Sequence, residues 1–314
     1  MPSKNFGDEL NPWLWPRLLP SFDKNSKNIF IGIGTVLNDA IPQWVRQADN
    51  VIFFSSGAGY GRRLRARTQP NWKIYCVRGP LSAQRLALPS QLAITDGAAL
   101  LKRYFAPVAT TERRYEVSYM PHFRHGSPQL FKEICARAGI HFIDPAGEVE
   151  SVIEQISHSQ LLISEAMHGA IVADTLRVPW IPVRTSPRIL PFKWKDWCRS
   201  VNLPYQPQIV RGVRTVPVQD YRYSLRLYFQ RQASIRSLLD DVSMTDSRGY
   251  VKTFKGRASE TLSDSLCRQL LSITRKMPYL SDEGTLDLLV ARLEERLETL
   301  KQDIGKGSFC SAFS

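Results

Sequence analysis

The best candidate for acid–base or phosphate chemistry in this sequence is a histidine at the end of an expected strand. His168 follows the apolar run Leu161–Ile163 and precedes a stretch, 170–176, with the apolar content of a buried helix. In open parallel sheets, ligands bind where strands end and loops lead into helices. Histidine side chains titrate near neutral pH, which suits proton transfer. An isolated histidine is more often a structural hydrogen-bonding residue, but this position favours a functional one.

Three further segments place candidate groups at strand ends or helix starts. Gly32–Thr35 and Ser55–Gly59 are glycine loops that follow apolar runs, where backbone N–H groups can approach an anion. Neither has the G-x-G-x-x-G pattern, which argues against a dinucleotide site, and each is equally compatible with a tight turn. Asn5–Asn11 places Asp8 directly after Gly7 at an expected helix start, so Asp8 is either a site carboxylate or a helix cap.

Basic side chains gather beyond residue 183. Arg184, Arg188 and Lys193 are close in sequence, and the run Phe192–Trp197 mixes aromatic and cationic groups. Cations can hold phosphate or carboxylate, and aromatic faces can stack on sugars. The tryptophans are equally compatible with an amphipathic helix whose aromatic face is core.

The whole chain is basic, with a net charge of +13 and a pI of about 9.7, which favours an anionic partner. The charges are scattered and form no nucleic-acid-binding arm, so no nucleic-acid partner is expected. Five cysteines without a CxxC pair argue against a disulfide framework or a zinc site. No apolar run reaches the roughly 18 residues of a membrane span, and no signal peptide is recognisable. The sequence predicts a cytoplasmic protein and is compatible with peripheral contact with the inner membrane face.

Short apolar runs alternate with helical patterns through the first two thirds of the chain, which predicts an α/β fold with parallel sheets. We expect strands at 28–34, 51–54, 73–77, 115–120, 141–143, 161–164 and 180–183. We expect helices at 80–86, 129–138, 149–157, 168–176, 224–241, 262–276 and 285–304. In the last helix the leucines at 286, 288, 289, 293, 297 and 300 form one stripe, expected to pack on the main body.

This pattern predicts four parts of the chain. The polar segment 106–114 separates the first two of them. Residues 1–112 and 113–210 are expected to form two Rossmann-like, doubly wound domains. Residues 211–304 are expected to form a helical C-terminal extension, and 305–314 a flexible tail.

Several of these segments resemble motifs of the polysaccharide pyruvyl transferases, especially the exopolysaccharide ketal-forming type of succinoglycan-like pathways. They occur in family order between about residues 5 and 205. The matching stretches are Asn5–Pro12, Val77–Ala83, Thr95–Leu101, Met120–His122, Ile143–Pro145, Glu165–Asp174 and Lys193–Trp197.

The resemblance implies two Rossmann-like domains facing a cleft, as in B-type glycosyltransferases. It implies phosphoenolpyruvate as donor, a glycan or polyprenyl-diphosphate-linked oligosaccharide as acceptor, and no metal or other cofactor. His168 matches the family's cleft histidine, near the donor phosphate and the reacting carbon. Arg78 and Asp8 match motif positions in the N-terminal half.

Ketal transfer from such a donor needs an acid, a base and cations. We expect His168 to act as acid or phosphate ligand, with Asp8 or Glu9 as base. Arg78 and Lys193 are expected to hold the donor. The other expected substrate-binding residues are Asn5, Gly7, Gly34, Gly57, His122, Glu165, Arg184 and Arg188.

Two departures from the family pattern bear on these expectations. Many relatives have an arginine where this chain has Ala166, so donor binding is expected to use Arg184, Arg188 or Lys193 instead. Relatives also have a strand before the N-F-G-D motif, whereas four residues precede it here, so that strand is expected to be missing. The alternative functions are a nucleotide-sugar glycosyltransferase of B-type fold and a non-catalytic basic binding protein.

Overall fold

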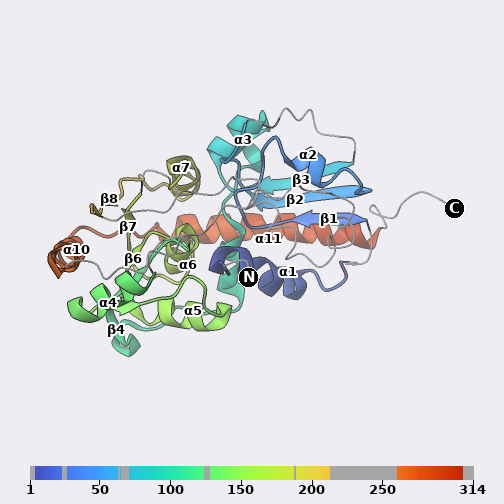
Figure 1. Cartoon of the computed structure of the whole chain (residues 1–314). Helices are drawn as coiled ribbons and strands as arrows, with labels where there is room; N and C mark the ends of the chain where they lie inside the picture. Colours follow the sequence, from blue (N-terminus) through green and yellow to red (C-terminus); the bar gives the residue numbers. More distant parts are fainter. Residues whose placement is uncertain are drawn as a thin grey trace.

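The computed structural model describes residues 4–22, 27–62, 64, 71–123, 128–186, 189–212 and 260–306. Within these ranges the strands form two parallel sheets (Figure 1). The first sheet has the order β1-β2-β3, with β1 (Asn28–Ile31), β2 (Asn50–Ser56) and β3 (Trp72–Val77). The second has the order β5-β4-β6-β7-β8, with β4 (Tyr115–Met120), β5 (His141–Phe142), β6 (Ser159–Ser164), β7 (Trp180–Arg184) and β8 (Gln208–Ile209).

Helices follow most of the strands, which confirms the expected α/β class. The helices are α1 (Phe6–Leu18), α2 (Ile41–Trp44), α3 (Pro80–Leu86), α4 (Pro128–Ala138), α5 (Val149–Ser157), α6 (Met167–Thr175), α7 (Pro191–Ser200), α10 (Glu260–Ile273) and α11 (Glu283–Gly305). Short 3-10 helices are η1 (Ser90–Leu92), η2 (Gly97–Arg103) and η3 (Thr110–Glu112). The expected strands and helices lie within a few residues of these bounds, except for the helix expected at 224–241, which is outside the described residues.

The strands of the first sheet are apolar on both faces because both faces are covered. In β2, Val51 and Phe53 pack in the cluster that includes Ile41 of α2 and Ala83 of α3. The alternate residues of the same strand point into the larger cluster that α1 and α11 also enter. Burial on both faces is typical of parallel strands with crossover helices.

The second sheet reverses its winding direction between β4 and β6. Numbered along the chain, its strands lie in the order second, first, third, fourth and fifth. In sheets of this kind the two connections that leave the central strands go to opposite sides, which opens a crevice at their carboxyl ends. The residues that follow β4 and β6 therefore flank that crevice.

Helix α1 is the element that joins the two sheets. In Figure 1 it lies beside α5 and α6, two helices that are far from α1 in the sequence. Phe6 and Leu10 are buried in the cluster that also contains Ile153 of α5, and the Phe6 N–H donates to the Pro145 carbonyl at 2.8 Å. Toward the first sheet, the Asn11 amide Nδ2 donates to the Ile33 carbonyl at 2.9 Å. The start of α1 is thereby fixed between the two halves of the chain.

The C-terminal helices are attached to both sheets. Before α11, the buried Asp174 carboxylate accepts hydrogen bonds from the Ser281 N–H at 2.9 Å and the Trp180 indole at 3.0 Å. Helix α11 then runs back along η2 and β3, where Tyr75 Oη donates to Asp303 at 2.5 Å. None of the helices within the described ranges is long and apolar enough to cross a membrane.

The stripe of α11 is narrower than expected. Leu286, Leu289, Leu293, Leu297 and Leu300 recur at spacings of three and four residues and are buried. Leu288 falls outside that spacing and is 63% exposed. The expectation that it belongs to the buried stripe is therefore wrong.

Two leucines of α11 provide a matched test of this packing. Leu293 is fully buried, so Leu293→Ala should lower the free energy of unfolding by about 2–5 kcal/mol. Leu288→Ala removes the same atoms from an exposed site and should change it by less than about 0.5 kcal/mol. Urea unfolding monitored by circular dichroism measures both, and equal losses for the two variants would contradict the packing of α11.

Candidate active site

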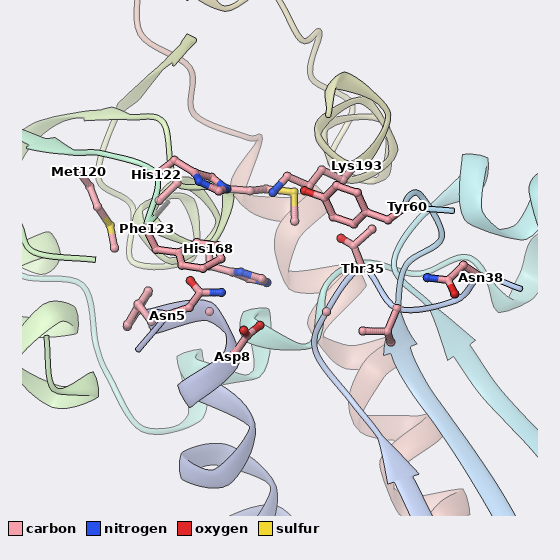
Figure 2. Close-up of a pocket in the computed structure, with 16 residues that line it drawn as sticks. Asn5, Asp8, Thr35, Asn38, Tyr60, Met120, His122, Phe123, His168 and Lys193 are labelled. Atoms are coloured by element: carbon pink, nitrogen blue, oxygen red, sulfur yellow. The ribbon is translucent and has the colours of Figure 1, made fainter. Parts of the chain in front are cut away.

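A cleft lies between the two sheets, at the ends of β1, β4 and β6 (Figure 2). The space within it amounts to about 850 Å³, a figure that includes space open to solvent. Its lining consists of Asn5, Phe6, Gly7, Asp8, Gly34, Thr35, Val36, Asn38, Tyr60, Met120, His122, Phe123, Ala166, Met167, His168 and Lys193. The cleft lies where the strand-end rule predicts a ligand to bind, because the loop after β4 and the start of α6 flank the reversal of the second sheet.

His168 projects from the first turn of α6 into this cleft. Its side chain is 13% exposed and lies against the start of α1 (Figure 2). A Cβ atom at Gly7 would lie 1.9 Å from His168 Nδ1, so only glycine lets the imidazole approach α1 this closely. Nε2 points the other way, toward the buried Asp96 carboxylate, at 3.6 Å.

Two helices begin at the cleft floor. Residues 5–8 of α1 and residues 166–168 of α6 all line it. The first turn of a helix leaves backbone N–H groups without intrahelical partners and carries partial positive charge, so such positions bind anions. In α1 the Phe6 and Asp8 N–H groups already donate to the Pro145 and Asn5 carbonyls, so α1 favours a negatively charged ligand through its partial charge, and α6 through its partial charge and its N–H groups.

Cationic and acidic side chains complete the lining. Lys193 reaches the cleft from α7, where it is 9% exposed, and its ammonium lies 5.9 Å from the Tyr60 ring centroid. His122 follows β4, and Asp8 carries the carboxylate nearest the start of α1. Such a site can hold an anion and offers separate groups for giving and taking protons. Among the described residues, no cluster of histidine, cysteine or carboxylate side chains is arranged to hold a metal ion.

Arg78, which we expected to hold the donor, lies behind the cleft wall. It is fully buried and its Nε pairs with Asp196 of α7 at 3.1 Å, while Nη1 donates to Thr35 Oγ1 at 2.7 Å. Gly57 makes room for the guanidinium, since a Cβ there would lie 2.1 Å from it. Neither residue lines the cleft, and Arg78 reaches it through Thr35.

Glu165 likewise supports the lining from behind. Its carboxylate is fully buried and accepts hydrogen bonds from the backbone N–H groups of His122 at 3.1 Å and Thr185 at 2.7 Å. It thereby joins the loops that follow β4 and β7. Burial, with the Glu165 charge as a smaller contribution, raises the pKa of Tyr119 well above its usual value, so this neighbouring phenol stays protonated.

Some of the other residues that we expected to bind substrate or act as base line the cleft, and others do not. Asn5, Gly7, Gly34 and His122 line the cleft, whereas Glu9 and Arg184 do not, and Arg188 is outside the described residues. Trp194 and Trp197 are buried against Trp180, so they are core residues and not a stacking surface for sugars.

Sequence reasoning did not single out several lining residues or Asp96. Thr35 lies in the first glycine loop and Tyr60 directly follows the second, but their side chains gave no chemical signal of their own. Asp96 lies in one of the recognised motifs, Thr95–Leu101, yet nothing in the spacing connects it with His168. That contact depends on the packing of η2 against α6.

Comparison with known proteins gives two matches. The sequence profile described as polysaccharide pyruvyl transferase matches residues 99–187, a range that includes β4, β6 and His168. The succinoglycan biosynthesis protein ExoV of Rhizobium meliloti (strain 1021) is 32% identical over 319 residues, covering 97% of this chain and 96% of that protein. No solved structure matches the chain.

The close approach of Gly7 and His168 can be tested by adding one methyl group. Gly7→Ala should push the imidazole toward the cleft, because the added carbon would overlap Nδ1. The His168 imidazole signals in NMR spectra should shift, while the protein stays folded because the ring can move into open space. Gly305→Ala is the matched control, since nothing lies within 4 Å of a Cβ there. Unchanged His168 signals in Gly7→Ala would contradict this geometry.

Proposed function

The chain belongs to the polysaccharide pyruvyl transferase family, and we propose on that premise that it transfers an enolpyruvyl unit from phosphoenolpyruvate to a sugar. Family membership makes it a transferase that acts on polysaccharide. The proposed product is a pyruvate ketal on a sugar of an exopolysaccharide or a lipid-linked oligosaccharide, with release of phosphate.

One observation carries the proposal: a single cleft contains His168, Lys193 and the starts of two helices. Phosphoenolpyruvate carries a phosphate and a carboxylate on three carbons. Helix N-termini and an ammonium group are suited to both anions. The near-complete burial of Lys193 reduces screening by water and strengthens its attraction for the donor.

The proposed reaction adds one proton and two sugar oxygens to the donor. A proton goes to the methylene carbon, which becomes a methyl group and leaves an oxocarbenium-like centre at the adjacent carbon. A sugar hydroxyl attacks that centre and loses its proton, and the bond to the phosphate oxygen then breaks. A second hydroxyl of the same sugar attacks and loses its proton, which closes the ketal and leaves inorganic phosphate.

Residues of the cleft fit the groups that this reaction needs. His168 is the proposed acid for the methylene carbon or a ligand of the phosphate, Lys193 is the proposed donor-binding cation, and His122 is proposed as a further substrate-binding residue. Asp8 lines the cleft and Glu9 does not, so Asp8 is the carboxylate we propose as base on the sugar hydroxyl. Arg78 is proposed to act on the donor through Thr35.

We propose a B-type glycosyltransferase-like arrangement for the fold, with Rossmann-like domains at 1–112 and 113–210. Two parallel sheets with a cleft at their carboxyl ends support it. Helix α1 is an exception to a strict division, because it packs on the second sheet's helices.

We also propose that the protein is cytoplasmic and touches the inner membrane face. That contact would bring the cleft to a polyprenyl-diphosphate-linked acceptor, and the net charge of +13 supports contact with anionic lipid.

Ligand-induced stabilisation distinguishes this donor from a nucleotide sugar. Phosphoenolpyruvate at about 100 times its Kd should stabilise the fold by about 2.7 kcal/mol, and so raise the Tm by several degrees. Uridine diphosphate should leave the Tm unchanged, because a three-carbon donor is proposed. Stabilisation by uridine diphosphate alone would favour the glycosyltransferase.

Two lysines of α7 provide a matched pair for the same titration. Lys193→Met should weaken phosphoenolpyruvate binding by about tenfold to a hundredfold, because a buried charge-assisted contact is lost. Lys195→Met removes an exposed charge from the same helix and should have little effect. Equal effects of the two substitutions would exclude a specific contact with Lys193.

The role of His168 is tested by turnover. His168→Ala should abolish phosphate release from phosphoenolpyruvate in the presence of acceptor, since the proposed proton donor is gone. Its circular dichroism spectrum should stay that of the wild type, because the buried residues that hold α6 in place are unchanged. Turnover at the wild-type rate would remove His168 from the mechanism.

A further inference from the structure

We propose that Asp96 is a positioning residue: its carboxylate lies 3.6 Å from Nε2 of His168 and holds the ring hydrogen on that atom, which leaves Nδ1 to exchange a proton in the cleft. This rests on the proposed function, because it takes His168 as the group that moves the proton. Asp96 itself does not line the cleft and touches no substrate.

One atom of each group, Asp96 Oδ2 and His168 Nε2, has no hydrogen-bond partner among the described residues. Asp96 is fully buried, and its Oδ1 accepts a hydrogen bond from the Ala98 N–H at 3.0 Å, which caps η2. Its Oδ2 lies 3.6 Å from His168 Nε2. Neither of those two atoms is accessible to water. An acceptor and a potential donor therefore face each other in isolation.

Elementary chemistry decides which tautomer this arrangement favours. A buried carboxylate oxygen without a donor is strongly unfavourable, and the imidazole is the group within reach. A neutral imidazole has one N–H, so it satisfies Asp96 only when the hydrogen is on Nε2. The distance of 3.6 Å is longer than a hydrogen bond, as is common for catalytic contacts before substrate binds and tightens them.

The opposite side of the ring belongs to the cleft. Nδ1 faces Gly7 at the start of α1, and His168 and Gly7 both line the cleft. A proton on Nδ1 of the imidazolium can pass to the donor's methylene carbon, which leaves the neutral ring with its hydrogen on Nε2. Asp96 stabilises the imidazolium before the transfer and holds the correct tautomer after it.

The position of Asp96 is rigid enough for this role. The residue is the N-cap of η2, whose Leu100 and Leu101 are buried in the main cluster, and η2 packs against α6. The chain also passes tightly at the next residue, because a Cβ at Gly97 would lie 2.3 Å from Ser55 Oγ. Carboxylate and imidazole are thus held by two packed elements from different parts of the chain.

Asp96→Asn separates the two functions of this carboxylate. The asparagine oxygen can still cap the Ala98 N–H, and this fixes the new amide NH₂ toward His168. Because an NH₂ group donates, Nε2 must become the acceptor and the ring hydrogen must move to Nδ1. NMR spectra of protein labelled with 15N-histidine report the tautomer directly, and His168→Ala identifies the signal.

The expected result is an Nε2–H tautomer in the wild type and an Nδ1–H tautomer in Asp96→Asn. We expect kcat of the variant to fall by about 10²–10⁴-fold. Its KM for phosphoenolpyruvate should change by less than about threefold, because the donor-binding groups remain. Asp282→Asn is the matched control: Asp282 caps α11 through the Thr285 N–H, far from the cleft, and its substitution should leave tautomer and kcat unchanged.

Two results would overturn the proposal: an Nδ1–H tautomer in the neutral wild-type ring, or an Asp96→Asn kcat within about twofold of the wild type. The first needs no variant, so it decides the question even where the substitution disturbs folding. If the wild type releases no phosphate from phosphoenolpyruvate, the proposed function is wrong. The tautomer measurement still shows in that case whether Asp96 orients His168.

Discussion

Burial of α1 between the two sheets is the constraint on which the cleft depends. Phe6, Leu10 and Leu14 are apolar, and the helix removes them from water by packing into the cluster shared with α5, α6 and α11. The same packing brings Gly7 against the imidazole of His168, so that residues from opposite ends of the family motifs meet. A helix that began even one turn later would move its N–H groups away from the ligand, because a turn advances the backbone by about 5.4 Å.

Buried charges behind the cleft explain why several motif residues do not line it. Arg78 connects β3 with Asp196 of α7, and Glu165 connects the loops after β4 and β7. Both side chains are fully buried, which is tolerated because hydrogen bonds surround them. Their positions give the lining residues Thr35 and His122 fixed backbone or side-chain contacts. Preorganisation of this kind suits a site that must hold a small anion and a sugar together.

Sequence patterns predicted the α/β class, nearly all the strands and the corner at which His168 stands, because apolar periodicity and strand-end geometry are local. They singled out Lys193, which lines the cleft, but left open whether its neighbours Trp194 and Trp197 stack on sugars or belong to the core, where they lie. They also did not reveal that the side chains of Asp96 and His168 face each other, or that α1 contacts α5. Those features arise from packing between segments far apart in the chain, and no spacing rule encodes that packing.

The central claim is that the cleft binds a three-carbon phosphate ester between the starts of α1 and α6. A crystal structure of the protein with phosphoenolpyruvate tests it most directly. The account predicts the donor phosphate on the first-turn N–H groups with the Lys193 ammonium in contact, and the methylene carbon beside Nδ1 of His168. A donor bound elsewhere, or an imidazole turned away from it and sealed from solvent, would contradict the account.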